Sequence, residues 1–230
     1  MLTVFLIFIV LLAFIFLGFP IFMSLLITGI LFLTLGGNSL GLTVIKMFGS
    51  ANSLSLLAIP YFVIAGNIIM KARITDKLVN FADAAVGWLP GGLGHVNVLT
   101  SMIFGGIQGS GCADAAAIGG MLIPAMEKQG YDKDYSVAVT AGSSMLSPII
   151  PPSIAMILYS YYTEVPVGRL FMGALVPGIL LGLLQMGVVY LEYRLRKYDI
   201  PRTRFSLRNL LTTAWHSLGA LMMPLIILSG

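Results

Sequence analysis

Long apolar runs follow one another along the chain, separated by short segments rich in glycine, proline or charge. A transmembrane helix needs roughly 20 mainly apolar residues. The pattern therefore predicts an all-α integral membrane protein of polytopic type, with helices at about 1–18, 20–36, 57–72 and 166–193. The mixed segment 37–56 carries Lys46, Asn52 and Ser53, and it fits a connecting arm at the membrane interface.

Residues 75–89 predict a different kind of helix, too short to cross a bilayer and apolar on one face. Its apolar residues recur at helical spacing opposite a polar and charged face: Leu78, Phe81, Ala82, Ala85 and Trp88. Thr75 fits an N-cap, and Pro90-Gly91-Gly92 fits a stop signal. Such a helix lies along the membrane surface or packs as a loop helix against protein, and the sequence leaves both interpretations open.

Two polar interruptions fall inside apolar sequence between residues 93 and 163. Gly109-Ser110-Gly111 divides 93–128 into limbs of about 16 residues, each short for a crossing, which predicts a re-entrant helical hairpin. The segment from Ser147 to Pro152 divides 134–163 and predicts a broken transmembrane helix. Backbone groups freed at membrane depth persist where they line a protein cavity, typically one that binds an ion or a solute.

Composition supports the membrane class and narrows the chemistry. Hydrophobic residues make up 58% of the chain and charged residues 10%, whereas about a quarter of the residues in a soluble domain are charged. The one cysteine, Cys112, excludes a disulfide within the chain and a multi-cysteine metal site. We interpret Cys112 as a small packing residue rather than a reactive thiol.

Charge placement orients the chain, because six of the thirteen basic residues lie between Arg194 and Arg208. The positive-inside rule places this loop in the cytoplasm. Counting backwards puts Glu164 and Arg169 outside, residues 127–134 and 75–92 inside, and the N-terminus outside. The net charge of +4 reflects this bias near anionic lipid, so we expect no nucleic-acid partner.

The hairpin tip offers groups for both an anion and a cation. Ser110 or Gly111 is expected to begin the helix of the second limb, leaving unpaired amide groups that attract an anion. Carbonyl groups at the end of the first limb, with the Ser110 hydroxyl, are oxygen ligands suited to a small cation. Asp114 is the one carboxylate between Asp83 and Glu127. An intramembrane carboxylate is a candidate functional residue, although Asp114 has the alternative role of stabilising the helix dipole.

The second break offers more oxygen, because its prolines remove backbone donors and leave carbonyl groups free near Ser144 to Ser147. Each serine hydroxyl has the alternative of bonding back to its own helix. We assign sodium binding to groups at both breaks: Ser110, Gly111, Ser144, Ser147 and Pro148. We assign substrate binding to the helix ends and nearby polar groups: Gly109, Ser110, Asp114, Ser143 and Ser153. No cofactor is expected beyond a bound sodium ion.

Several motifs resemble, in order and spacing, those of the large membrane subunit of tripartite ATP-independent periplasmic (TRAP) transporters. The run from Leu56 to Gly66 is similar to the signature L-x-I-P-x-F-x-x-A-G. The other matching motifs are Pro90-Gly91-Gly92-Leu93-Gly94, Gly109-Ser110-Gly111 with Ala113-Asp114, Pro124-x-Met126 before Gly130-Tyr131, and Ile149-Ile150-Pro151-Pro152-Ser153. The resemblance runs from about Gly18 to the last residue. Cys112 departs from it, since the family usually has Ser or Ala there.

The resemblance implies a sodium-coupled secondary transporter of the elevator type in the bacterial inner membrane, with a periplasmic N-terminus. It implies import of an organic acid, such as a C4-dicarboxylate, sialic acid or sugar acid. The implied partners are a periplasmic substrate-binding protein and a small four-helix membrane subunit. The family fold has two inverted repeats, each with a hairpin and a broken helix. We therefore expect this chain to supply the first repeat and the start of the second, and either not to transport alone or to be part of a chain about twice as long.

On this interpretation the chain divides into five parts. Residues 1–72 hold scaffold-like early helices and the interfacial arm, and 73–92 hold the amphipathic helix at the cytoplasmic surface. The transport-type region at 93–163 contains the hairpin and the broken helix. Residues 164–205 form a long span and the basic loop, and 206–230 begin the second repeat.

Other function classes fit less well or remain as alternatives. The chain lacks the G-x-x-x-x-G-K-[ST] loop of an ATP-driven pump. An enzyme is not expected, because His95 and His216 stand apart and neither belongs to an H-E-x-x-H motif. An ion channel with a re-entrant loop and a non-transporting scaffold subunit remain the alternatives to a carrier.

Overall fold

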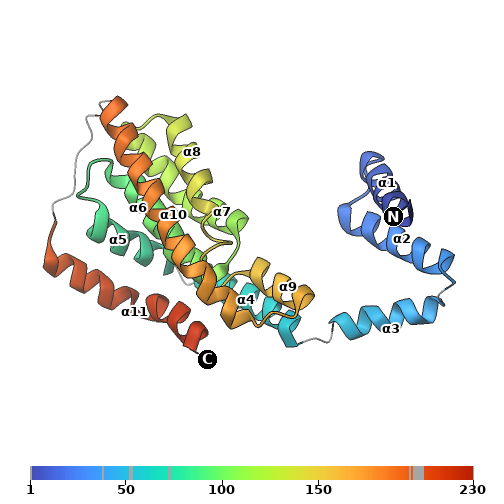
Figure 1. The fold of residues 1–230 in the computed structure, drawn as a ribbon. Coiled ribbons are helices and arrows are strands. Elements are labelled where there is room, and N and C mark those ends of the chain that lie inside the picture. The colour runs from blue at the N-terminus through green and yellow to red at the C-terminus, as the bar shows by residue number, and fades with distance from the viewer. Residues whose placement is uncertain are drawn as a thin grey trace. The chain divides into compact units, whose positions relative to one another are not determined.

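The computed structural model describes residues 2–37, 39–51, 54–71, 74–196, 198 and 205–229. Every regular element in these ranges is a helix, which confirms the all-α class. The chain forms two compact units, residues 1–54 and 55–230 (Figure 1).

The first unit contains α1 (Leu2–Phe16), α2 (Ile21–Leu35) and α3 (Leu40–Ala51). Gly18, with φ of +84°, turns the chain between α1 and α2, and these two helices pack against each other. Each has 15 residues, which gives about 22 Å at 1.5 Å per residue. The helices predicted at 1–18 and 20–36 are thus confirmed as helices, while their crossing of a membrane stays a prediction. Helix α3 lies within the predicted arm, of which Asn52 and Ser53 fall outside the described residues.

The second unit is a bundle with helices along its sides. Its helices are α4 (Leu54–Lys71), α5 (Ile74–Val86), α6 (Gly92–Gln108), α7 (Gly111–Lys128), α8 (Lys133–Ser144), α9 (Ile154–Thr163), α10 (Val167–Arg196) and α11 (Leu207–Ser229). Helices α6, α7, α8 and α10 pack together, and α5 and α11 run along one flank (Figure 1). Among the described residues, α10 is the one helix long and apolar enough to cross a bilayer by length and composition. It matches the long span predicted at 166–193.

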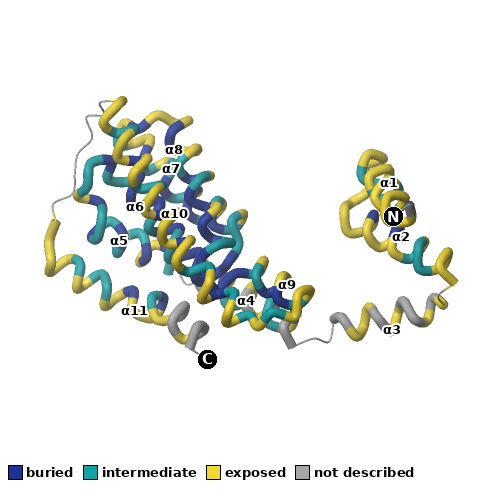
Figure 2. The backbone as a smooth tube through the Cα atoms, in the orientation of Figure 1, coloured by how far each residue is buried: buried dark blue, intermediate teal, exposed yellow. Residues whose placement is uncertain are grey.

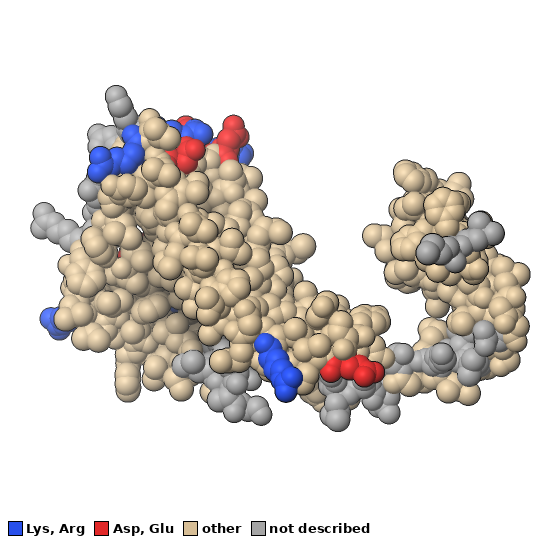
Figure 3. Space-filling model, viewed as in Figure 1, with Lys and Arg blue, Asp and Glu red and all other residues tan. Residues whose placement is uncertain are grey.

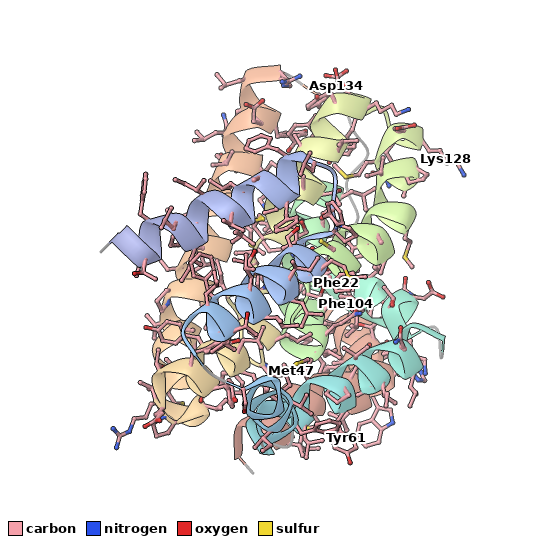
Figure 4. The ribbon with its side chains drawn as sticks, turned by 90° about the vertical axis from the view of Figure 1, so that its right-hand side faces the viewer. Phe22, Met47, Tyr61, Phe104, Lys128 and Asp134 are labelled. Carbon is pink, nitrogen blue, oxygen red and sulfur yellow. The ribbon has the colours of Figure 1, made fainter. Side chains whose placement is uncertain are left out.

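Helix α6 is the centre of the bundle, because it packs against α5, α7, α8, α10 and α11. Its fully buried Phe104 and Ile107 meet Ile118 and Leu122 of α7 in one apolar cluster. Phe104 lies inside the unit, with Lys128 and Asp134 at one end of it and Tyr61 at the other (Figure 4). The burial colours also show α6 as an inner helix, whereas α10 exposes much of its length (Figure 2).

The amphipathic helix predicted at 75–89 is present as α5. Leu78 and Ala82 on its apolar face are fully buried in the cluster around α6, and Asp76 and Lys77 on the opposite face are exposed. Thr75 lies inside the first turn rather than before it, so its prediction as the N-cap is wrong. The apolar face packs on protein, as the second interpretation held; the position of α5 at the membrane surface stays a prediction.

Charged residues of the second unit gather toward its ends (Figure 3). At one end, Arg196 of α10 pairs with Asp132 in the α7–α8 turn at 3.1 Å. Gly91, before α6, lies at the same end, because a Cβ placed there would be 3.1 Å from Val189 of α10. Gly91, Asp132 and Arg196, which belong to three segments predicted to share the cytoplasmic side, therefore lie at one end of the bundle. Their orientation in a membrane stays a prediction.

Candidate functional site

The hairpin tip forms where glycine allows a tight reversal between two helices. Helix α6 ends at Gln108. The capping residue Gly109 has a left-handed φ of +63°, and its N–H donates to the Gly105 carbonyl at 2.8 Å. Such a conformation favours glycine. Ser110 is the N-cap of α7, and its hydroxyl accepts from the Ala113 N–H at 3.5 Å. The prediction that Ser110 or Gly111 begins the second limb is therefore confirmed.

The second break separates α8 from α9 by the turns at residues 145–152. Its prolines stop the helix, since they lack the N–H that a helix interior requires. Ser153 begins α9, because its hydroxyl accepts from the Met156 N–H at 3.4 Å. The same hydroxyl donates to the Pro148 carbonyl at 2.7 Å. Ser153 thus ties the two sides of the break together.

The two breaks lie against each other, although they are more than thirty residues apart in the chain. A Cβ on Gly109 would be 2.7 Å from the Pro152 carbonyl oxygen, and a Cβ on Gly111 would be 2.9 Å from the Ser144 carbonyl oxygen. Contacts below 3.0 Å leave no room for a side chain. Glycine is therefore required at both positions for the hairpin tip to reach the broken helix.

The breaks also lie level with the interior of α10 rather than with its ends. Ile150 packs on Gly178, where an added Cβ would be 2.9 Å from the Ile150 Cγ1. Gly178 is about 17 Å along the helix from Val167 and about 27 Å from Arg196, at 1.5 Å per residue. Helix α10 is also joined to the break region by Gln185, which donates to the Gly142 carbonyl at 2.9 Å.

Asp114 is the charged group at this junction. It is fully buried in the first turn of α7, and neither carboxylate oxygen has a hydrogen-bond partner among the described residues. The hydroxyls of Ser101 and Ser147 lie beside it, and the Ser147 hydroxyl is also buried without a partner. A buried, unpartnered carboxylate is unfavourable unless a cation or proton neutralises it.

A chain of buried polar side chains leads away from Asp114 between α6 and α8. Ser101 donates to Ser143 at 3.1 Å, Ser143 donates to the Asn97 amide oxygen at 2.8 Å, and the Asn97 amide nitrogen donates to Thr140 at 2.7 Å. We call these four residues, which are at most 3% exposed, the polar row. Ser143, which we predicted to bind substrate, belongs to this row. Its side chain is therefore buried behind the contact between the two breaks rather than at the surface of that contact.

The polar row contains three residues that the sequence analysis missed: Asn97, Ser101 and Thr140. A signal for them exists, because residues at i, i+4 and i+8 share one helix face. Asn97, Ser101 and Gly105 follow that spacing on α6. Polar and small residues repeating on one face of an apolar helix indicate a helix contact or a site.

The remaining predicted residues fall into two groups. Ser144 bonds back to the Ala141 carbonyl at 2.9 Å, as its alternative role held, while its own carbonyl faces the hairpin tip. Gly109, Gly111 and Pro148 line the contact between the breaks. Cys112, just past the tip, is exposed rather than packed inside the unit. The assignment of sodium or substrate to any one of these residues stays a prediction.

The chain is similar in sequence to one protein family and to several known proteins. The chain matches the family model "Tripartite ATP-independent periplasmic transporter, DctM component" over residues 8–230. It is 36% identical over 217 residues to the sialic acid TRAP transporter permease protein SiaT of Haemophilus influenzae, covering 94% of this chain and 35% of that protein. It is 38% identical over 186 residues to the C4-dicarboxylate TRAP transporter large permease protein DctM of Pseudomonas aeruginosa, covering 81% of this chain and 43% of that protein.

A third relative is the sialic acid TRAP transporter large permease protein SiaM of Vibrio cholerae. The identity is 34% over 218 residues, covering 94% of this chain and 50% of that protein. The chain therefore spans between about a third and a half of the length of these curated relatives.

Proposed function

Because the chain belongs to the DctM component family of tripartite ATP-independent periplasmic transporters, we propose that it forms the first part of a sodium-coupled permease for an organic acid. The observation that carries this proposal is the meeting of two helix breaks around a buried carboxylate without a partner. The relatives carry names that specify sialic acid, C4-dicarboxylate or 2,3-diketo-L-gulonate. All of these solutes are acids, so an organic anion is the substrate class that we infer.

Charge supports the proposed position of the cation, and the helix ends support that of the anion. Because a buried carboxylate attracts a cation rather than an acid, we reassign Asp114 from the substrate to sodium. A sodium ion beside Asp114 would neutralise the carboxylate and take oxygen ligands from Ser147 and from carbonyl groups of the second break. The first turns of α7 and α9 leave amide groups that favour a carboxylate. A bound sodium ion holds these two helix ends together, and this is how sodium binding would increase the affinity for the acid.

The proposed movement is of the elevator type. The region at 93–163 carries the hairpin and the broken helix and would slide as a body between the two faces of the inner membrane. The early helices at 1–72 would belong to the scaffold, together with a small four-helix membrane subunit. A periplasmic binding protein would deliver the acid. Support for a re-entrant hairpin comes from the level of its tip along α10, well inside the ends of that long apolar helix.

The test is uptake by the complete permease, reconstituted with its small membrane subunit and supplied with its binding protein. A thermal-shift panel of organic acids on the binding protein first identifies the substrate. We expect saturable uptake that requires an inward sodium gradient and stops in the triple variant Ser110→Ala, Ser147→Ala, Asp114→Ala. Uptake that persists in this variant would overturn the site, and single-channel currents without saturation would favour the channel alternative.

A further inference from the structure

The polar row fixes the direction of each of its hydrogen bonds. Thr140 has one hydroxyl proton, which it donates to the Ser136 carbonyl at 2.8 Å. Thr140 must therefore accept from its other partner, the Asn97 side chain at 2.7 Å. Only the amide nitrogen of Asn97 can donate. Its amide oxygen consequently faces the opposite way, toward Ser143.

The same reasoning continues to Ser101. The Ser143 hydroxyl donates to the Asn97 amide oxygen at 2.8 Å or to the Thr140 carbonyl at 3.0 Å. In either case its one proton is used, so Ser143 accepts from Ser101 at 3.1 Å. The proton of Ser101 therefore points away from Asp114, and only lone pairs of its oxygen remain for the space beside the carboxylate.

Two groups with oxygen lone pairs thus lie next to each other in the interior of the bundle. The Ser101 hydroxyl lies beside the Asp114 carboxylate, both residues have 0% exposure, and neither carboxylate oxygen has a hydrogen bond of good geometry to a described residue. Neutral hydroxyl and anionic carboxylate oxygens are both hard ligands, the kind that alkali and alkaline-earth cations take in proteins.

We propose that Ser101 is a further ligand of the coupling cation, and that Asn97 is the positioning residue that orients its hydroxyl through Ser143. This inference rests on the proposed function. It adds a residue from the middle of α6, which lies outside the sequence of both helix breaks. Asn97 itself does not touch the cation. It acts by accepting the Ser143 proton, which leaves Ser143 free to accept from Ser101.

The experiment measures how sodium raises the melting temperature of the purified protein, with choline replacing sodium at constant ionic strength. A ligand that binds the folded state raises stability with its concentration, so the curve gives a half-saturating sodium concentration. The variants are Ser101→Ala, Ser143→Ala and Asn97→Leu, with the double variant Ser101→Ala/Asn97→Leu. Ser160→Ala is the matched control. It removes a buried serine hydroxyl that donates to the Val165 carbonyl at 2.6 Å, outside the polar row.

We expect the three single variants to raise the half-saturating sodium concentration roughly five- to tenfold, the value of about one hydrogen bond. Ser160→Ala should change it less than twofold. The double variant should resemble Ser101→Ala, because two residues acting through one hydroxyl are not additive. A purely structural role would lower the melting temperature without changing the sodium dependence, and that result would overturn the inference.

The two proposals fail in different ways in this experiment. If sodium has no effect on the wild-type protein, the proposed sodium site itself is wrong. If sodium stabilises the wild type and the polar-row variants keep its half-saturating concentration, only the role of Ser101 and Asn97 is wrong. Ser143→Ala keeps the test decisive should Asn97→Leu fail to fold, since it breaks the same connection with a smaller change.

Discussion

Asp114 is an ionisable side chain in the interior of the bundle, so its charge needs a compensating partner. It is fully buried, its two carboxylate oxygens lack hydrogen-bond partners among the described residues, and no ion pair to it is present there. Burying an ionised carboxylate without compensation is strongly unfavourable. A bound sodium ion removes the penalty, so the stability of the fold and the occupancy of the site should depend on each other.

Replacing Asp114 by Asn should separate these two effects. The amide keeps the shape of the side chain, removes the charge and brings a donor toward Ser101 and Ser147. We expect Asp114→Asn to melt at a higher temperature than the wild type in sodium-free choline buffer and to lose the further increase that sodium produces. Asp134→Asn, at an exposed carboxylate of α8, is the control and should keep the sodium response. A normal sodium response in Asp114→Asn would count against the site.

Individual site residues were predictable from sequence only where their type differs clearly from that of their neighbours. Asp114 stands out as an isolated carboxylate in apolar sequence, and Ser110 follows a helix-breaking glycine. Asn97 and Ser101 do not stand out, because their meaning comes from Ser143 and Thr140, more than forty residues away. Sequence spacing gives the face of a helix, whereas the partner of that face depends on tertiary packing.

At the scale of elements, the contact between the hairpin and the broken helix depends on the absence of side chains. Gly105, one turn before the tip, faces Ser147, and an added Cβ would lie 2.6 Å from the Ser147 Cα and 2.9 Å from its hydroxyl oxygen. The nearest atom is backbone, which cannot turn aside as a flexible side chain can. The sequence predicted both breaks from their glycine, serine and proline content and assigned sodium ligands to both, but it did not predict the close backbone contact at Gly105.

Gly105→Ala should therefore force the hairpin away from the break. We expect it to lower the free energy of unfolding by about 1–3 kcal/mol, as overpacking does, and to abolish sodium-dependent uptake in the complete permease. Gly120→Ala on α7 is the matched control, because no atom lies within 4 Å of its added Cβ. It should be neutral or slightly stabilising, since alanine is the better helix former. Equal activity in the two variants would contradict the close contact.

The end of the bundle opposite the site is held by a different set of contacts. Tyr131 and Tyr135 stack at a ring distance of 5.8 Å, and Tyr198 packs against both. The Tyr198 hydroxyl donates to the Asp132 carboxylate at 2.7 Å, and Arg196 contacts the same oxygen at 3.1 Å. These contacts connect α10 to the turn between α7 and α8.

The Asp132 contacts predict a pH dependence. The hydrogen bond from Tyr198, with the hydrogen bond and charge of Arg196, lowers the pKa of Asp132 below its usual 3.8. A lowered carboxyl pKa adds stability above the unfolded pKa, and this contribution is lost as the pH falls through the folded pKa. Asp132→Asn should thus be slightly less stable than the wild type at neutral pH, with the difference disappearing in acid below about pH 4. Thermal melts at a series of pH values measure this, and a difference that grows in acid would contradict it.

At the scale of the whole molecule, the position of the site depends on how the chain crosses the membrane. The helices α8 and α9 together run from the end that holds Asp132 and Arg196 toward the start of α10, with the break between them. Charge counting had predicted which segments share a side, because loop charges are local in sequence. Each of the two units packs on itself. Helix periodicity therefore did not predict how the proposed scaffold and the site are connected.

Thiol labelling tests the predicted orientation. In a Cys112→Ser background, which removes the one native cysteine of the chain, new cysteines replace Lys133 or Glu164. A membrane-impermeant maleimide applied to spheroplasts should label Glu164→Cys directly and Lys133→Cys only after permeabilisation. Labelling of both positions from outside would show that α8 and α9 do not form one broken crossing.

The most direct measurement of the central claim is equilibrium binding of radioactive sodium to the purified protein. The hairpin tip and the broken helix, together with Asp114, are proposed to enclose one cation. We predict saturable binding that excess unlabelled sodium displaces and choline does not, and that disappears in Asp114→Asn and Gly105→Ala but persists in Asp134→Asn and Gly120→Ala. Absence of saturable binding to the wild-type protein, or equal binding in all four variants, would contradict the account.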